Sequence, residues 1–320
     1  MKLLVVIVNY RSADLTIDCL RSCAPEILDC PGTKVIVTDN LSPDDSVPKL
    51  TEAIAREGWN SWCEFSPQPA NGGFAYGNNR GFENAMKSPE APEYILLLNP
   101  DTIVRPGAFR TMVEFLDSHP NVGLIGSRLE DPDGTAQISA FRFPGILSEF
   151  EQGVRFGPIS KVLNKFRVAP PVQNEPHKTD WVAGASLMIR KSVVDKIGLM
   201  DEKYFMYYEE VDWCLQAARA GFECWYVPQA HIVHLVGQSS GVTNVKQPAK
   251  RRPRYWFESH RRYFKKNYGL IYTIVADLAW ATGFGLFRIR QLFQNKPTND
   301  PPKLWTDFVT YNFVPRASRP

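Results

Sequence analysis

The 320-residue sequence lacks the patterns that mark several common classes of protein. Its six cysteines form no C-x-x-C pair and no Cys–His set at zinc-finger spacing, which argues against a metal cage and favours reduced thiols in the cytosol. The absence of a G-x-G-x-x-G run disfavours a dinucleotide-binding fold, and the absence of an internal repeat disfavours a repeat architecture. A formal net charge of +3 is too small to indicate nucleic-acid binding.

The composition is that of a globular protein with a substantial core. Apolar residues make up 44% of the chain and charged residues 22%, which are ordinary shares. The apolar run at residues 3–8 ends at a polar asparagine without the small-residue cleavage site of a signal peptide. We therefore interpret this run as a first buried strand.

The first half of the chain alternates short β-branched runs with amphipathic stretches. The predicted strands cover 3–8, 34–38, 63–66 and 94–98, and the predicted helices cover 13–23, 46–57, 74–86 and 106–115. This alternation predicts an α/β fold with a mostly parallel, doubly wound, Rossmann-like central sheet flanked by helices. Ligands of such sheets bind at the carboxyl ends of the strands, so the residues that follow each strand are the first candidates for chemistry.

The second half is less regular. Its Pro- and Gly-rich stretch at 131–178 predicts an irregular insertion. Regular patterns return with an apolar stretch at 181–189, a helix at 210–220, a strand at 223–227 and a histidine-bearing stretch at 230–237. From these patterns we expect one main domain over 1–240, a helical segment over 250–296 and an extended, proline-rich tail over 297–320.

The helical segment combines a basic half with an apolar half. Basic residues crowd 246–266, and the run at 270–287 contains Asp277 as its one acidic or basic residue. A charge near the centre disfavours a simple membrane span. The aromatic residues and the following Arg288 and Arg290 favour an amphipathic helix lying in a membrane surface. The alternative is a helix packed on the core or against a second copy of the chain.

Polar residues follow each of the predicted strands. They are Asn9 and Tyr10, Asp39 and Asn40, Asn71 and Gly73, and Asn99 and Asp101. Asp39 can accept the ring N–H of a pyrimidine base, with Asn9 and Tyr10 lining the same pocket. The alternative is that such residues form turns or cap helices.

Two further groups of residues can carry chemistry. Asp101 at the end of a strand suits Mg²⁺ or Mn²⁺, with His234 as a second ligand, although a turn would explain Asn99 and Asp101 equally well. The acidic residues Glu209, Glu210 and Asp212 stand among aromatic residues, where desolvation can raise the pKa of a carboxyl group toward that of a useful base. Their alternative role is to stabilise the N-terminus of the following helix.

Six strings in this order resemble the inverting family-2 glycosyltransferases of the GT-A fold, in particular the rhamnosyltransferase-like branch of bacterial surface-polysaccharide synthesis. The resemblance covers about residues 3–269. Its strings are VIVNY at 6–10, VTDNLS at 37–42, NGGFAYGNN at 71–79, LLNPD at 97–101, GASLMIR at 184–190 and FMYYEEVDW at 205–213.

The resemblance implies a role for each matched residue. Asn9, Tyr10, Asp39 and Asn40 are implied to hold the nucleotide, and Asn71, Gly73, Asn79 and Asn99 to lie along the donor. Asp101 corresponds to the last position of the D-x-D metal motif, whose first Asp is replaced here by Asn99, and His234 is similar to the histidine that completes the metal site in some members. Glu210, after Glu209, takes the position of the general base, and Asp212 supports the helix or meets the acceptor.

The implied reaction is the metal-dependent, inverting transfer of a sugar from a nucleotide diphosphate to a hydroxyl of a lipid-linked or polysaccharide acceptor. The leading donor is dTDP-L-rhamnose, otherwise a UDP-sugar. The basic, aromatic stretch at 251–268 favours an anionic lipid or a polyprenyl-diphosphate acceptor over nucleic acid, and we expect a cytoplasmic protein bound peripherally to the inner face of the plasma membrane. The alternatives are a sugar-1-phosphate nucleotidyltransferase and a non-catalytic glycan- or nucleotide-binding protein on the same scaffold.

Overall fold

The computed structural model describes residues 1–235, 249–294 and 299–314, and these residues form two compact units. The first unit contains Met1–Phe141, Pro171–Phe205 and residues 209–235. The second unit contains Arg142–Pro170, Met206–Tyr208 and the described residues from 249 onward. The division differs from the predicted one, because residues 142–170 belong with the C-terminal helices and not with the main domain. The predicted boundary at 240–250 lies largely outside the described residues.

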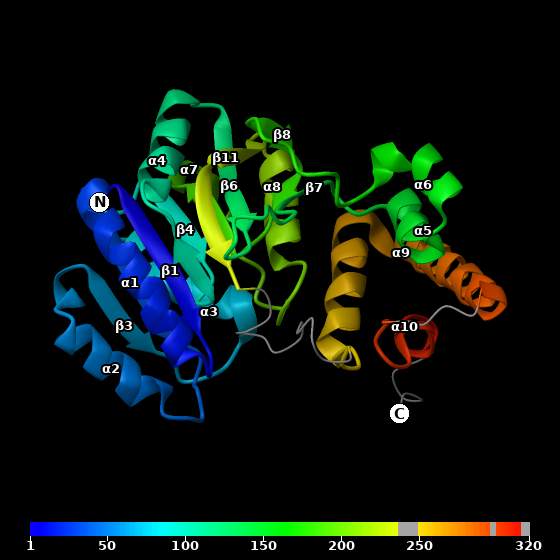
Figure 1. Ribbon diagram of the computed structural model, residues 1–320, viewed down its shortest axis with the longest axis horizontal. Coiled ribbons are helices and arrows are strands. Elements are labelled where there is room, and N and C mark those ends of the chain that lie inside the picture. The colour runs from blue at the N-terminus through cyan, green and yellow to red at the C-terminus, as the bar shows by residue number, and fades with distance from the viewer. Residues whose placement is uncertain (236–248, 295–298, 315–320) are drawn as a thin grey trace. The chain divides into compact units, whose positions relative to one another are not determined.

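The first unit is an α/β domain, as predicted (Figure 1). Its strands are β1 (Leu3–Asn9), β2 (Thr33–Asp39), β3 (Cys63–Pro67), β4 (Tyr94–Leu98), β5 (Thr102–Val104), β6 (Val122–Glu130), β7 (Ala140–Phe141), β8 (His177–Thr179), β9 (Trp181–Val182), β10 (Ser186–Arg190) and β11 (Glu223–His234). Its helices are α1 (Ala13–Asp29), α2 (Ser46–Arg56), η1 (Trp59–Ser61), α3 (Gly73–Met86), α4 (Ala108–Ser118), α7 (Lys191–Ile197) and α8 (Glu209–Arg219).

In the described part of the chain, nine strands form the main sheet. Their order is β3-β2-β1-β4-β10-β6-β11-β5, with β8 also paired to β11. β1, β2, β3 and β4 are parallel, and their carboxyl ends are in register: Asn9 lies opposite Asp39, and Ile7 lies opposite Leu98. β10 runs antiparallel to both β4 and β6, so the sheet is mixed beyond the predicted parallel strands.

The two faces of β1 pack against helices in different ways. Leu3, Val5 and Ile7 join one apolar core with residues of α1, α2 and α4. On the other face, Gly77 and Gly81 of α3 approach Val8 and Val6 so closely that a Cβ would stand 2.6 and 2.4 Å from their methyl groups. The glycine spacing of one helical turn therefore sets how near α3 lies to the sheet.

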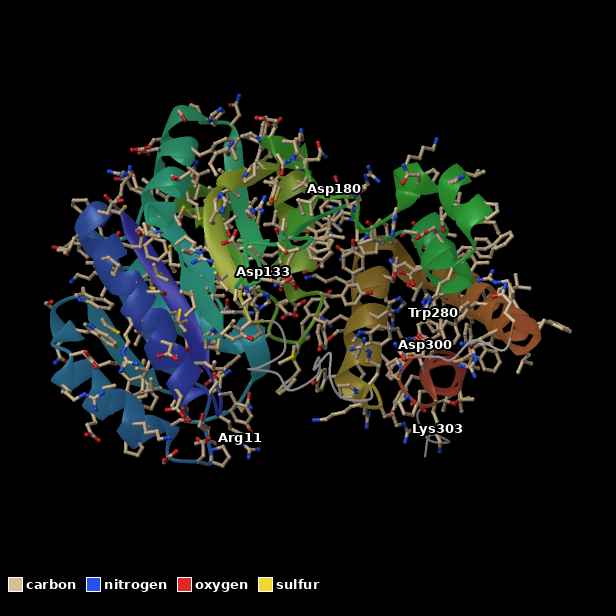
Figure 2. All side chains as sticks on the ribbon, in the orientation of Figure 1. Arg11, Asp133, Asp180, Trp280, Asp300 and Lys303 are labelled. Atoms are coloured by element: carbon tan, nitrogen blue, oxygen red, sulfur yellow. The ribbon has the colours of Figure 1, made fainter. Side chains whose placement is uncertain are left out.

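The second unit is helical. It contains α5 (Ile146–Val154), α6 (Gly157–Val162), η2 (Asn164–Phe166), α9 (Arg254–Gln294) and α10 (Leu304–Phe313). A non-helical Gly269, with φ 84°, divides α9 into two helices at the boundary between the basic and the apolar half of the predicted segment. Trp280, labelled in Figure 2, lies in the second half of α9. It packs on Phe308 of α10 with ring centroids 4.1 Å apart.

Two predictions about the second half of the chain were wrong in detail. Residues 142–170 form α5, α6 and η2, although the stretch was predicted to be irregular, because α5 packs on α9 through Gly153 and Gly283. The tail was predicted to be extended, but Leu304–Phe313 is helical because Leu304 and Phe308, one turn apart, bury their side chains against α9.

Buried ionisable groups face one another inside the second unit. Nε2 of His260 lies 3.0 Å from Glu149 Oε2, and Nδ1 lies 3.6 Å from Asp277 Oδ1. Arg261 Nη1 lies 3.5 Å from Asp277 Oδ2 and donates to the carbonyl oxygen of Asn312. Burial acts to lower the pKa of His260, but Glu149 and Asp277 outweigh it and raise the pKa. Burial raises the pKa of Asp277 to about 6, against the opposing effect of His260 and Arg261.

Candidate active site

The ends of β1 and β2 are joined by buried side-chain hydrogen bonds. Asn9 Nδ2 donates to Asp39 Oδ2 at 2.6 Å, and Asn9 Oδ1 accepts from the hydroxyls of Ser12 and Thr16. The backbone N–H and the hydroxyl of Ser42 both donate to the Asp39 carboxylate. Asn9 and Asp39 are fully buried and hold the strand ends, while the nucleotide role that the sequence predicted for them stays a prediction.

These bonds hold two loops in an unusual conformation. Arg11 and Leu41 have φ values of 57° and 55°, in the left-handed region that non-glycine residues seldom adopt. Arg11 N–H donates to the Ser42 hydroxyl. Tyr10, which lies between Asn9 and Arg11 in the chain, is 39% exposed. Ser42 lies in the string VTDNLS but was not predicted to be a site residue, although a serine three residues after a strand-end aspartate is a turn signal. The arrangement leaves Tyr10 accessible to a ligand.

At the N-terminus of α3, the backbone of another segment lies unusually close to the helix. Gly73 has φ 86°, and a Cβ there would stand 1.8 Å from the carbonyl oxygen of Phe205, which accepts a hydrogen bond from Phe74 N–H. Asn40 Nδ2 donates to the Gly73 carbonyl, and Asn71 Oδ1 accepts from Gly73 N–H. Glycine is therefore required at position 73, and Asn40 and Asn71 fix the turn around it.

Asn79 has a different environment from the predicted one. It is fully buried, its Nδ2 donates to the Met200 carbonyl and to Glu202, and its Oδ1 accepts from Met200 N–H. The side chain thus holds α3 to the loop that precedes α8. We interpret Asn79 as a structural residue, because its donors and its acceptor are engaged by the protein.

Asp101 and His234 lie together, as the sequence predicted. Thr102 of β5 pairs with His234 of β11, and this register brings the His234 Nε2 to 3.6 Å from Asp101 Oδ1. Asp101 is 1% exposed. The neighbouring His231 has another partner, Glu130, at 3.0 Å. Burial acts to raise the pKa of Glu130, but hydrogen bonds from His231 and Arg105 lower it overall.

The acidic residues predicted for catalysis form the first turn of α8. Glu209 and Asp212 are buried, and Gln216 Nε2 donates to Asp212 at 3.3 Å, which is consistent with support of the helix. Burial raises the pKa of Glu210, although the backbone N–H groups of Gly184 and Val211 donate to its carboxylate and partly offset the effect. Oε2 of Glu210 accepts no hydrogen bond from the described residues. Glu210 therefore has the properties of a general base.

A continuous series of contacts connects these groups within the first unit. Asn40 holds Gly73, and the Phe74 ring lies against Gly184. Gly184 N–H donates to Glu210, and the next residue, Ala185, accepts a hydrogen bond from Asn99 N–H at 3.0 Å. Asn99 and Asp101 share one short turn, closed by the Thr102 hydroxyl on the Asn99 carbonyl. We name this set the strand-end site; its members are Asn9, Tyr10, Asp39, Asn40, Gly73, Asn99, Asp101, Gly184, Glu210 and His234.

Among the described residues, no group of three or more His, Cys, Asp or Glu side chains is placed to hold a metal ion. Asp101 and His234 are thus a pair. The six cysteines contribute no ligands to this site, and all six are free and buried. One cavity of about 820 Å³ lies at the edge of the sheet beside β2 and β3, and another of about 710 Å³ lies in the second unit.

Comparison with known proteins identifies the family. The family model described as glycosyl transferase family 2 matches residues 4–198. The chain belongs to glycosyl transferase family 2. The match includes the β1, β2 and β4 ends of the strand-end site, while Glu210 and His234 of this glycosyltransferase lie beyond it.

Characterised relatives share part of their length with this glycosyltransferase. It is 27% identical over 215 residues to N-acetylglucosaminyl-diphospho-decaprenol L-rhamnosyltransferase of Mycobacterium tuberculosis, covering 65% of this chain and 68% of that protein. It is 28% identical over 165 residues to the rhamnosyltransferase WbbL of Escherichia coli K12, covering 51% and 60% respectively.

Solved structures confirm the GT-A fold. The mannosyltransferase PcManGT from Pyrobaculum calidifontis, in complex with GDP-Man and Mn²⁺, superimposes with a TM-score of 0.56 at 12% identity, covering 97% of this chain and 83% of that one. The predicted fold and the predicted enzyme class, a glycosyltransferase, are therefore both confirmed.

Proposed function

We propose that this glycosyltransferase moves L-rhamnose from dTDP-rhamnose to a hydroxyl of a polyprenyl-diphosphate-linked acceptor, with inversion at the sugar carbon. The observation that carries the proposal is the match to two rhamnosyltransferases, one of them named for a decaprenol-linked acceptor, by a chain with Asp101 beside His234. The choice of dTDP as the nucleotide rests on the resemblance of the six sequence strings to the rhamnosyltransferase-like branch of the family.

The residues at the strand-end site fit a divalent cation. A carboxylate oxygen and an imidazole nitrogen 3.6 Å apart are chemically suitable ligands for Mn²⁺. Neighbouring ligands of an octahedral ion with bonds of ~2.1 Å lie about 3 Å apart, so a small side-chain adjustment suffices. Asp101 and His234 would hold the ion, whose chemistry when bound is to neutralise the departing diphosphate. Since two protein ligands leave the shell incomplete, we expect the donor's phosphates to supply others.

Glu210 is proposed as the base. The acceptor oxygen attacks the anomeric carbon while its proton passes to the Glu210 carboxylate, and the bond between that carbon and the phosphate oxygen breaks with its electron pair on dTDP. The raised pKa brings Glu210 closer to working pH, and the Gly184 N–H holds the carboxylate in place. Tyr10 is proposed to stack on the pyrimidine ring of the donor nucleotide, and Gly73 is proposed to let the donor approach the backbone closely.

The second unit is proposed to bind a membrane surface. By length and composition, α9 is long and apolar enough to cross a membrane. The kink at Gly269 and the buried Asp277 favour instead a helix lying on the surface. Its exposed apolar residues, which we name the apolar face, are Leu270, Ile271, Ile274, Val275, Leu278, Leu286, Ile289, Leu292 and Phe293. A peripheral position on the inner face of the plasma membrane would follow.

The test is transfer by the purified protein in Mn²⁺. The acceptor is polyprenyl-diphospho-N-acetylglucosamine, and the donors are dTDP-rhamnose, UDP-glucose and UDP-N-acetylglucosamine, with product detected by mass spectrometry. Rhamnosylated lipid from dTDP-rhamnose is the expected result, with at least tenfold less product from the UDP-sugars. A faster reaction with a UDP-sugar would reject the donor, and transfer to a free glycan alone would reject the lipid acceptor.

A further inference from the structure

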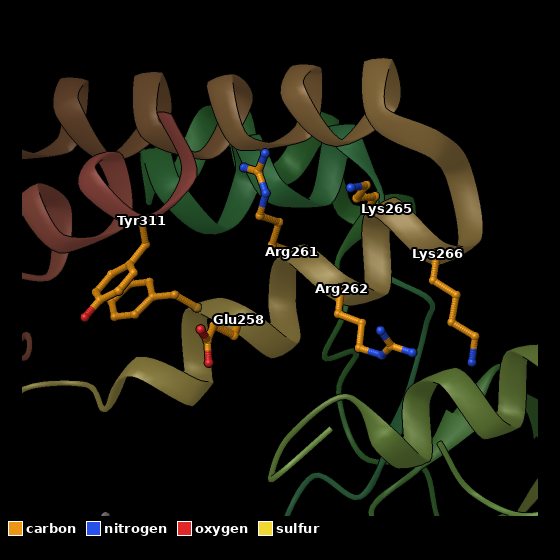
Figure 3. A pocket seen from close by; sticks show the side chains of 7 residues that line it. Glu258, Arg261, Arg262, Lys265, Lys266 and Tyr311 are labelled. Atoms are coloured by element: carbon orange, nitrogen blue, oxygen red, sulfur yellow. The ribbon is translucent and has the colours of Figure 1, made fainter. Parts of the chain in front are cut away.

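The second unit contains a cavity of about 710 Å³ with a concentrated positive charge. Its walls come from two elements, successive turns of the first half of α9 and one residue of α10 (Figure 3). The lining residues are Phe257, Glu258, Arg261, Arg262, Lys265, Lys266 and Tyr311. Four of these seven side chains are cationic, and the one carboxylate, Glu258, is already paired with Arg254 at 2.9 Å.

The cations are arranged in a way that helix stability does not explain. Arg261 and Lys265, and likewise Arg262 and Lys266, stand one turn apart on the same face, where like charges destabilise a helix. Lys265 and Lys266 gain some compensation from the end of the helix at Gly269, but the two arginines stand a turn further from it.

The cavity has fixed and adjustable donors. Arg261 is held in place, because its Nη1 donates to the Asn312 carbonyl and lies 3.5 Å from Asp277. The Tyr311 ring stacks on Phe257 with centroids 4.8 Å apart, and both residues line the cavity. Lys265 and Lys266 are exposed and can adapt to a ligand. This combination of rigid guanidinium, phenol and flexible ammonium groups suits phosphate oxygens.

An apolar surface begins where the basic one ends. The apolar face starts at Leu270, directly after the kink, and Ile271 is 82% exposed. A ligand with an anionic head and an apolar chain would therefore match both surfaces. A diphosphate head carries more negative charge than the phosphodiester of a phospholipid, and it suits four cations better.

From these observations we infer that the cavity lined by Arg261, Arg262, Lys265, Lys266 and Tyr311 is a binding site for the diphosphate of an isoprenoid lipid. The identification of that lipid as the sugar acceptor rests on the proposed function. The binding site itself rests on the cavity and its charges.

The test measures calorimetric binding of farnesyl diphosphate, a soluble isoprenoid diphosphate, to the full chain. EDTA is present so that a metal at Asp101 and His234 makes no contribution. The variant is Lys265→Gln/Lys266→Gln, and the matched control is Lys161→Gln/Lys165→Gln, which removes two lysines from the α6 region of the same unit. We expect at least tenfold weaker binding in the variant and unchanged binding in the control. Tyr311→Phe, which keeps the ring, should weaken binding by a smaller factor.

Two further ligands separate the sources of the anion. Farnesol should bind the wild type and the variant equally, since it lacks the diphosphate. Flotation with phosphatidylcholine vesicles containing phosphatidylglycerol should be nearly unchanged in the variant. Equal affinity of the wild type and the variant for farnesyl diphosphate would overturn the proposal. A loss of phosphatidylglycerol binding as large as that of farnesyl diphosphate binding would also overturn it, in favour of a general anionic-lipid surface.

The same proteins distinguish this inference from the proposed function. If the wild type transfers rhamnose and the lysine variant binds farnesyl diphosphate normally, the site is rejected and the function stands. If the wild type fails to transfer rhamnose but its farnesyl diphosphate binding depends on Lys265 and Lys266, the function is rejected and the site stands.

Discussion

The two units differ in how they use buried polar side chains. In the first unit, Asn9, Asn40 and Asn79 are joined to carboxylates and to backbone groups by hydrogen bonds in which one partner at most is charged. In the second unit, His260 and Asp277 are ionisable groups that face each other in the core. An uncharged amide does not itself gain or lose a proton, whereas the second arrangement depends on which groups carry protons, as do the pairs of Asp101 with His234 and Glu130 with His231 in the first unit. The comparison predicts that substitutions in the two units will be detected by different measurements.

The largest expected effect is that of Glu210→Gln on catalysis. The substitution keeps the shape of the side chain and removes the base, so kcat should fall by about 10²- to 10⁴-fold while dTDP binding is retained. Steady-state kinetics and calorimetry measure the two quantities. The control is Glu64→Gln, on an exposed position of β3, which should leave both unchanged. Full turnover of the Glu210 variant would show that this carboxylate is not the base and has a structural role, like the other buried polar groups of the first unit.

The next effect concerns the pH dependence of stability in the second unit. The pKa of Asp277 is about 6 in the folded chain, above its ordinary value of 3.8, so the native state binds the proton more tightly and this side chain's contribution to stability falls as pH rises through that window. The fall is on the order of 3 kcal/mol. Asp277→Asn does not titrate, so its stability relative to the wild type should rise between pH 4 and pH 7.

Calorimetric unfolding of the full chain at several pH values measures that difference. Ionisable groups distant from Asp277 titrate in both proteins and cancel. The pKa of His260 is raised less in the variant, which acts in the same direction as the loss of Asp277. If the stability difference between the two proteins stays constant with pH, or changes in the opposite direction, the stability of the second unit does not depend on the protonation of Asp277.

A smaller effect is expected at the contact between α5 and α9. A Cβ on Gly283 would stand 2.8 Å from the Phe150 carbonyl oxygen and 2.9 Å from Val154 N, both backbone atoms that cannot easily move. Gly283→Ala should therefore destabilise the chain by about 1–3 kcal/mol. Gly285→Ala is the matched control, since its Cβ would meet only Trp305 Nε1 at 3.8 Å and alanine favours a helix. Thermal unfolding that ranks the two variants in the reverse order would contradict the close packing.

The smallest effect is expected for the proposed metal ligands. Asp101→Asn should weaken dTDP-rhamnose binding about tenfold or more in Mn²⁺ and leave it unchanged in EDTA, because it removes a charged ligand and keeps the shape. His231→Gln is the control, since His231 lies on the same strand but pairs with Glu130. Equal loss in both conditions would make Asp101 a structural residue like Asn79.

The same comparison explains what could be predicted from sequence. The parallel strands were predicted within a residue or two. β1 and β4 are buried apolar runs that a polar residue follows or ends, and β2 and β3 alternate with amphipathic helices. β5 was missed since it has three residues and exists through its pairing with β11. The proximity of Asp101 and His234 was predicted from their residue types and from the family resemblance, whereas the engagement of Asn79 with Met200 depends on a contact across 121 positions and has no local signal.

The helical unit was predicted less well because its stability comes from contacts between distant segments. The sequence of α5 gave no reason to separate it from the main domain, since its partner, α9, lies about 100 residues further along. The signal for α10, Leu304 and Phe308 one turn apart, was present but was outweighed by the surrounding prolines.

The interleaving of the two units has a consequence for synthesis of the protein. Residues 142–170 leave the ribosome before the strands that complete the first unit, and before the helix on which they will pack. At about 5–20 residues per second, α5 waits roughly 5–20 s for α9 to be made. Throughout that interval the faces of Gly153 and Val154 are uncovered. The nascent chain thus carries an unpartnered helix while the rest of the first unit is made, and we expect slow translation through 171–254 to increase its demand for chaperones.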